Sequence, residues 1–81
     1  MKITNRIRDS IAGFKKASGQ KPARVQLDDL LEVRLASDSS LDPQVVFDKP
    51  TNQWFVDGTP VDVVMGLGTD VRCLAAEGEP V

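Results

Sequence analysis

The chain has 81 residues, 41% of them hydrophobic and 27% charged, which predicts a single small domain with a modest core and excludes wholesale disorder. It has no histidine and one cysteine, Cys73, so imidazole catalysis, a histidine-ligated metal and a disulfide within the chain are excluded. The formal net charge of −2 is unevenly distributed: residues 1–24 hold seven basic residues against one acidic residue, and residues 25–81 hold three against eleven. A basic leader before an acidic body indicates two surfaces with different partners.

Residues 1–20 are predicted to form a basic amphipathic helix. Thr4 or Asn5 can cap its start, and Gly19 suits the left-handed conformation that ends many helices. Gly13 weakens the helix by up to about 1 kcal/mol relative to alanine, so we expect the helix to need a partner surface. The apolar residues of this segment recur at the spacing of one helical face, namely Ile3, Ile7, Ile11, Phe14 and Ala17.

Residues 19–23 predict a linker, in which Pro22 disfavours helix at the residue before it. A second helix is predicted over residues 28–38, with Asp28 as its N-cap and acidic residues in its first turn. Its apolar residues follow helical spacing, and they are Leu27, Leu30, Leu31 and Leu35.

Beyond residue 40 the pattern changes to short β-branched and aromatic runs separated by turn-rich segments, which is typical of strands. Pro60 fits the edge or the start of a strand because it has no N–H to donate. The fold class is therefore predicted to be α+β, with one or two N-terminal helices packed on a small three- to four-stranded antiparallel meander. The predicted strands cover residues 45–47, 53–56, 61–65 and 71–74.

The chain is thus predicted to consist of the basic amphipathic helix over residues 1–20, a small α+β body over residues 21–76 and a flexible tail over residues 77–81. It has no run of about 18 apolar residues, so no transmembrane helix is expected. The first ten residues lack the apolar core of a signal peptide, so secretion is not expected.

The stretch Gly66-Leu67-Gly68 raises the question of a phosphate-binding loop. A dinucleotide fingerprint needs a third glycine where Val71 stands, and the thirteen residues after Gly68 are too few for a helix and a returning parallel strand. No Lys-Ser or Lys-Thr pair follows, as a P-loop would need. The two glycines are instead predicted to reverse the chain so that residues 71–74 pair back on residues 61–65.

Acidic residues gather at positions 28–32 and 38–42, but neither group has the ligand spacing of a calcium loop. We interpret them as helix caps and solvated surface. Cys73 follows Arg72, which can favour a thiolate, yet its place in a strand predicts a small buried core residue. No catalytic, cofactor-binding or metal-ligating residue is therefore proposed, no cofactor is expected, and the chain is not expected to be an enzyme.

The N-terminal helix is the main candidate for binding a partner. The nucleic-acid alternative is disfavoured because the body is acidic and no aromatic residues interleave with the cations. Four interpretations stay open: a core helix with solvated cations, docking on another protein, contact with nucleic-acid phosphates, and binding to a membrane surface. The candidate residues on this helix are Arg6, Arg8, Phe14, Lys15 and Lys16.

Trp54 and Phe55 are two further candidates for partner binding. In a strand over residues 53–56 their side chains point to opposite faces of the sheet. One is expected in the core, and the other can remain on the surface as an aromatic anchor for a protein partner.

Two stretches, KPARVQLDDLLEVRLASD and FVDGTPVDVVMG, together give a leucine-rich acidic helix, a G-x-P-V-x-V strand and a short last strand. This layout, over residues 21–74, resembles small phage- or prophage-encoded accessory proteins. The resemblance implies a non-enzymatic role as a virion or assembly component, or as a small acidic inhibitor that binds a host protein.

The partner implied by this resemblance is another protein, of the virion or of the host. A homo-oligomer stays open as an alternative. The expected location is the cytoplasm of a host cell or the interior of a virion, and the lone cysteine fits a reducing compartment.

Overall fold

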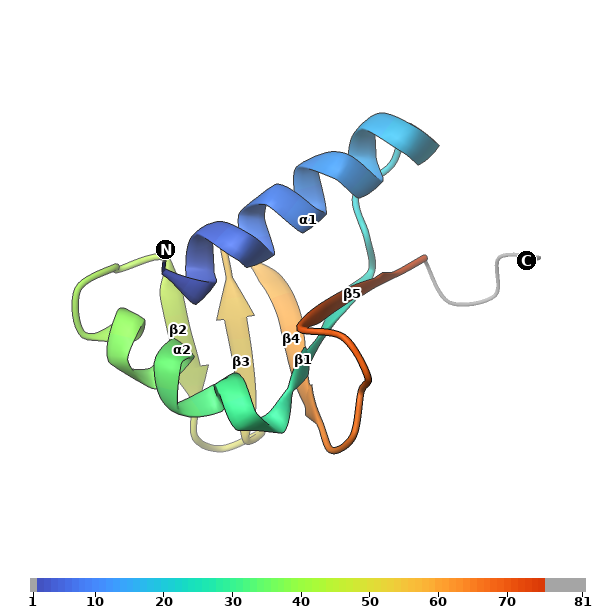
Figure 1. Cartoon of the computed structure of the whole chain (residues 1–81). Coiled ribbons are helices and arrows are strands. Elements are labelled where there is room, and N and C mark those ends of the chain that lie inside the picture. Colours follow the sequence, from blue (N-terminus) through green and yellow to red (C-terminus); the bar gives the residue numbers. More distant parts are fainter. Residues whose placement is uncertain (1, 76–81) are drawn as a thin grey trace.

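The computed structural model of the protein describes residues 2–75, which form a five-stranded sheet and two α-helices on one side of it (Figure 1). The predicted tail, residues 77–81, lies outside the described residues. The α+β class predicted from the sequence is confirmed. The elements run in the order α1 (Ile3–Ser18), β1 (Arg24–Asp28), the short 3-10 helix η1 (Asp29–Leu31), α2 (Glu32–Ser39), β2 (Val45–Asp48), β3 (Gln53–Val56), β4 (Thr59–Val64) and β5 (Val71–Leu74).

The sheet has the strand order β2-β3-β4-β1-β5. The strands β2, β3 and β4 form an antiparallel meander, as predicted, but β1 lies parallel to β4 and β5 lies antiparallel to β1. The prediction of three or four strands was therefore too low by at least one. Pro60 is the second residue of β4 and precedes the parallel pairing with β1, which begins at Val61, so its missing N–H interrupts no ladder there.

The additional strand is β1, at a place where the sequence predicted the end of a linker and the approach to a helix. Val25 and Leu27 are fully buried and alternate with Arg24, Gln26 and Asp28. This two-residue period matches a strand covered on one face. The predicted second helix begins later, at α2, and Asp28 caps η1 instead, accepting a hydrogen bond from the Leu30 N–H at 3.1 Å.

The predicted pairing of the last strand was wrong. Residues 71–74 form β5, which pairs with β1 and not with β4, placing Cys73 beside Val25. Both edges of β4 are already taken by β3 and β1, so β5 cannot pair with β4 and instead joins the free edge of β1. Gly66 and Gly68 have φ values of 67° and 82°, and the loop that they bend leads the chain past the end of β1.

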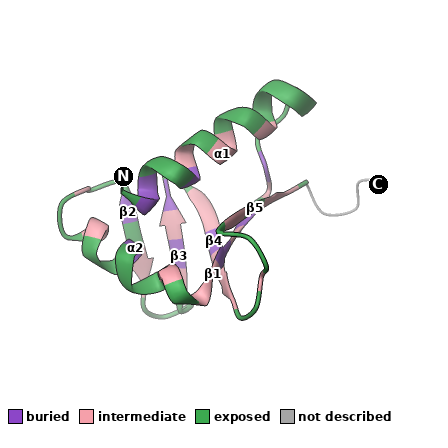
Figure 2. Ribbon diagram, viewed as in Figure 1, coloured by how far each residue is buried: buried purple, intermediate pink, exposed green. Residues whose placement is uncertain are grey.

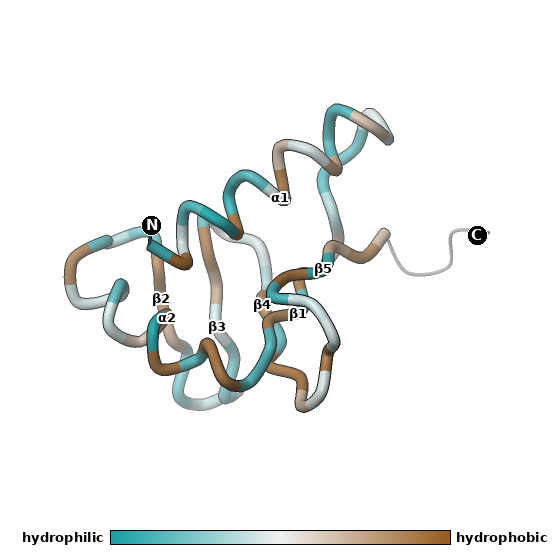
Figure 3. The backbone as a smooth tube through the Cα atoms, in the orientation of Figure 1, coloured by the Kyte–Doolittle hydropathy of each residue, from teal (hydrophilic) through white to brown (hydrophobic). Residues whose placement is uncertain are grey.

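The core lies between the helices and one face of the sheet (Figure 2). The helix α1 buries Ile3 and Ile7, and α2 buries Leu35. Beyond Ile11, which is partly buried, α1 extends past the sheet and is largely exposed. Figure 3 shows that hydrophobic and hydrophilic residues alternate along α1, so the exposed part of the helix also carries apolar side chains. The predicted apolar face of α1 is thus buried only over the first turns of the helix.

The two ends of α1 are stabilised in different ways. Neither predicted cap is used, because the N-cap is Lys2, which makes no side-chain cap hydrogen bond. Instead Asp38 of α2 accepts hydrogen bonds from the Thr4 N–H at 3.0 Å and from the Thr4 hydroxyl at 2.7 Å. The predicted C-terminal end is confirmed, since Gly19 has φ 76° and its N–H bonds the Lys15 carbonyl.

Candidate functional site

Arg8, a predicted partner-binding residue, is engaged within the chain. Its guanidinium donates two hydrogen bonds to Asp57, Nε to Oδ2 at 2.8 Å and Nη2 to Oδ1 at 2.9 Å. A third nitrogen, Nη1, lies 3.0 Å from Asp42 Oδ2. Asp57 and Gly58 both have positive φ, as a two-residue hairpin turn of type I′ requires, and this turn brings Asp57 to the helix. Arg8 therefore connects α1 to the β3–β4 turn and to the loop after α2.

The ion pairs at Arg8 change the titration of all three groups. Hydrogen bonds to Asp57 and then to Asp42 raise the pKa of Arg8 above its ordinary value. The hydrogen bond from Arg8 holds the pKa of Asp57 below its usual range. The pKa of Asp42 is also lowered, first by the Gln44 N–H and then by Arg8. All three groups therefore stay charged at neutral pH.

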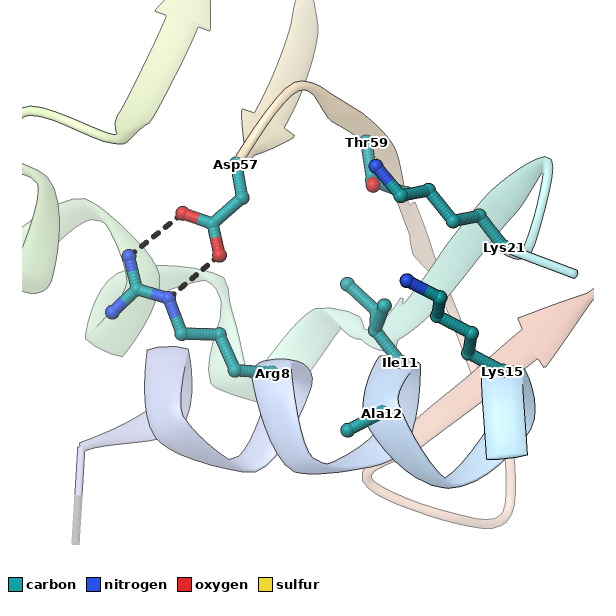
Figure 4. Close-up of a pocket in the computed structure, with 7 residues that line it drawn as sticks. All are labelled: Arg8, Ile11, Ala12, Lys15, Lys21, Asp57 and Thr59. Atoms are coloured by element: carbon teal, nitrogen blue, oxygen red, sulfur yellow. Dashed lines mark hydrogen bonds and ion pairs between the residues drawn. The ribbon is translucent and has the colours of Figure 1, made fainter. Parts of the chain in front are cut away.

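Beside this ion pair lies a cavity of about 280 Å³ between α1 and the β3–β4 turn, which we call the lysine cavity (Figure 4). One wall comes from α1, the opposite wall from the turn, and the third side from the linker that leads to β1. The residues that line it are Arg8, Ile11, Ala12, Lys15, Lys21, Asp57 and Thr59.

The lysine cavity has unbalanced positive charge. Arg8 and Asp57 neutralise each other, whereas the side chains of Lys15 and Lys21 make no hydrogen bond or ion pair with any part of the chain between residues 2 and 75. Figure 4 shows the ammonium ends of both lysines on the Thr59 side of the cavity. The sequence identified Lys15 but not Lys21, whose only local signal is its position in a short linker after a basic helix.

The other candidates on α1 point elsewhere. At 100° per residue, Arg6 lies on the opposite flank of the helix from Arg8. Its Nη2 is 3.7 Å from Asp70 Oδ2, and both side chains are about half exposed. Lys16 is exposed, and Phe14 is half-buried. The predicted cations therefore do not form one patch, and only Arg8 and Lys15 share a cavity.

Trp54 and Phe55 point to opposite faces, as predicted, and Trp54 is the one in the core. It is 8% exposed, its indole Nε1 donates to Glu32 Oε2 at 3.1 Å, and its ring lies 4.8 Å from that of Phe47. Phe55 points to the side of the sheet away from the helices. Of the two aromatic residues, Phe55 is the surface candidate.

The sheet face that carries Phe55, which we call the open face, faces away from both helices (Figure 1). The strand register places Val46 beside Phe55 and Phe55 beside Pro60. These three side chains form an apolar row across β2, β3 and β4. Val46 is 50% exposed, and the other two residues are half-buried.

A polar pair borders the apolar row on the open face. Arg24 of β1 donates to Asp62 of β4, with Nε 2.7 Å from Oδ2, and also donates to the Gln53 amide oxygen. This contact lowers the pKa of Asp62. The row is therefore bordered by charges that are already paired within the chain, so a partner would contact apolar side chains next to a neutralised pair.

Cys73 lies on the helix side of β5, partly buried against the core, and burial raises the pKa of its thiol. Within residues 2–75, no three side chains of His, Cys, Asp or Glu gather closely enough to hold a metal ion. Neither α1 nor α2 has the length and apolar character needed to cross a membrane.

Comparisons of the chain with family models, with curated proteins and with solved structures found no match. Its function is therefore inferred from two features of its own surface, the apolar row on the open face and the lysine cavity beside α1.

Proposed function

We propose that this chain is a non-enzymatic protein-interaction module, of the kind that phages encode as virion or assembly components, and that its partner docks on the apolar row. The observation that supports the proposal is the row of Val46, Phe55 and Pro60 on a sheet face that faces away from both helices. The solvated face of an antiparallel sheet is normally polar. An apolar row there is stabilised when a partner covers it, by about 25 cal/mol for each Å² removed from water.

Phe55 is suited to the centre of such an interface. It lies between Val46 and Pro60, so a partner that covers the row would enclose its ring from both sides. Buried aromatic side chains surrounded by smaller contacts supply much of the binding energy in protein complexes. The acidic body, with eleven acidic residues against three basic residues over residues 25–81, would steer the approach of a partner with a net-basic surface.

The proposal is tested by changing the row without changing the core. The variants V46S and F55S make the row polar, and L41S is the matched control because Leu41 is 74% exposed in the loop after α2. Tagged protein is isolated from its source cell or particle, and bound proteins are identified by mass spectrometry. We expect one partner to bind the wild type and L41S and to be lost from V46S and F55S, while all variants keep the same circular dichroism.

A partner retained by both V46S and F55S would contradict the proposal. Analytical ultracentrifugation of the purified chain gives an independent result. Self-association that V46S and F55S abolish would assign the row to a second copy of this chain in place of a different protein.

A further inference from the structure

We infer that the lysine cavity binds an organic carboxylate, whose charged end lies between Lys15 and Lys21 and whose apolar part lies against Ile11 and Ala12. The cavity is on the helix side of the sheet, away from the apolar row. The inference is therefore independent of the proposed function, and each can fail without the other.

The charge balance of the cavity favours the binding of a negative group, because the side chains of two of its lining lysines are paired with no acidic residue of the described chain. The ammonium groups of Lys15 and Lys21 carry like charges into one cavity, and like charges repel. Asp57 is the one acidic residue that lines the cavity, and both of its carboxylate oxygens already accept hydrogen bonds from Arg8. An anion between the lysines would relieve their repulsion and accept charge-assisted hydrogen bonds from both.

The position of the cavity on α1 favours a carboxylate over a phosphate. The residues of α1 that line it lie in the middle and last turns, so no free N–H groups of a helix N-terminus face the ligand. The guanidinium of Arg8, which could grip a phosphate with two parallel hydrogen bonds, is held by Asp57. Two lysine ammonium groups and the Thr59 hydroxyl remain, and they can donate hydrogen bonds to both oxygens of a carboxylate.

The rest of the lining suits a ligand with an apolar portion. Ile11 points from α1 toward the cavity in Figure 4, and Ala12 also lines it. A volume of about 280 Å³ lies just below the range of about 300–1,000 Å³ that is usual for ligand pockets, and it admits a short aliphatic chain or one amino-acid residue. The carboxylate can therefore come from a free aliphatic acid, from the C-terminus of a peptide or from an acidic side chain of a peptide.

The test uses the full chain, labelled with ¹⁵N, and three small probes at constant ionic strength. Hexanoate supplies the carboxylate and the apolar tail, hexanamide is its neutral counterpart, and inorganic phosphate is an anion without a tail. We expect hexanoate to cause saturable shifts in the amide signals of Ala12, Lys21 and Thr59. Hexanamide should leave these signals unchanged, and phosphate should bind more weakly than hexanoate.

Three variants separate the cavity from general electrostatic attraction. K15Q and K21Q should each raise the Kd for hexanoate about tenfold or more, because each removes one charge-assisted hydrogen bond. K16Q removes the same charge from the adjacent residue, which is exposed and does not line the cavity, so its Kd should match that of the wild type. Lys15 and Lys21 are also exposed, so thermal melts of all three variants should overlay.

The source of the carboxylate is identified with three tripeptides: one ending in leucine with a free carboxyl group, its C-terminal amide, and an amide that contains glutamate. Binding of the free acid alone assigns the site to chain termini, binding of the glutamate peptide assigns it to acidic side chains, and binding of hexanoate alone assigns it to free acids.

Four results would overturn the inference. These are no saturable binding by any carboxylate probe, equal shifts with hexanamide, tighter binding of phosphate than of hexanoate, or a loss of affinity in K16Q as large as in K15Q.

Discussion

At the scale of single residues, Arg8 shows how the fold changes the role of a cation. The sequence places Arg8 on the flank of an amphipathic helix, where it resembles a residue free to meet a partner. Its carboxylate partner, Asp57, is 49 positions away and reaches Arg8 only because the Asp57-Gly58 turn faces α1. The contact uses both oxygens of the carboxylate, so Arg8 stabilises the fold and positions one wall of the lysine cavity.

We predict that R8Q lowers the free energy of unfolding at neutral pH, with the Arg8–Asp57 pair contributing about 0.5 kcal/mol, as exposed pairs do. The pKa of Asp57 and that of Asp42 are lowered in the folded protein. Their stabilisation is therefore fully present above the unfolded value of about 3.9 and is lost as the pH falls through the folded pKa values. In urea unfolding, the free energy of unfolding of R8Q should be lower than that of the wild type at neutral pH, and the two values should be equal in strong acid.

The control for this prediction is R6Q. Arg6 lies 3.7 Å from Asp70 and is about half exposed, so its removal should change stability less than R8Q does. If the free energy of unfolding of R8Q still differs from that of the wild type in strong acid, the prediction is wrong. Arg8 would then stabilise the fold through packing of its aliphatic stem.

At the scale of elements, α1 depends on α2 for its start. The residue at the N-cap position, Lys2, has no side-chain acceptor, and four backbone N–H groups at a helix start need partners. Asp38, 34 positions away, accepts from the backbone and the hydroxyl of Thr4, and it places a negative charge near the positive end of the helix dipole. One side chain thus caps α1 and joins the two helices.

We predict that D38A destabilises the protein by about 1 kcal/mol, the cost typical of a lost N-cap. Thr4 is 1% exposed, so its hydroxyl would lose its partner in a site with little access to water. The matched control is D9A, because Asp9 lies exposed on α1 and no hydrogen bond or ion pair joins its side chain to residues 2–75. Chemical denaturation of both variants checks the prediction, and equal effects of D38A and D9A would contradict it.

At the scale of the whole molecule, β1 joins the two halves of the sheet. It pairs in parallel with β4 on one side and antiparallel with β5 on the other, so it extends the β2–β4 meander to a fifth strand. Its buried residues, Val25 and Leu27, face the helices between Val61 and Val63 of β4 and Val71 and Cys73 of β5. The strand that the sequence did not reveal is therefore an internal strand, and its pairing with β4 is parallel.

We predict that the amides of β1 exchange with solvent more slowly than those of the edge strands β2 and β5. A strand bonded on both sides opens only with the larger unit around it, whereas edge strands open locally. Native-state hydrogen exchange followed by NMR measures this order directly. Fast exchange at Val25 and Leu27, with slow exchange at Cys73, would contradict the topology and would favour a meander that ends with β5 against β4.

The sequence by itself determined what depends on near neighbours. The 3.6-residue period predicted α1, Gly19 ended it as expected, and the turn-rich segments separated β2, β3 and β4 correctly. The opposite orientations of Trp54 and Phe55 also followed from the two-residue period of a strand. Composition alone excluded chemistry that requires histidine. These features were predictable because hydrophobic period, turn residues and helix ends act over a few residues.

Only the tertiary structure decided what depends on distant pairing. Residues 24–28 become a strand because β4 and β5 supply hydrogen-bond partners on both sides. In the sequence this strand is hidden by the helical spacing of the leucines that begins at residue 27. Arg8 finds Asp57, and Lys21 joins Lys15 at one cavity, because α1 and the linker after it pack beside the β3–β4 turn. Strand pairing and ion pairing across the sheet depend on which edges and faces remain unoccupied once the core has formed. The local sequence of each segment does not determine this.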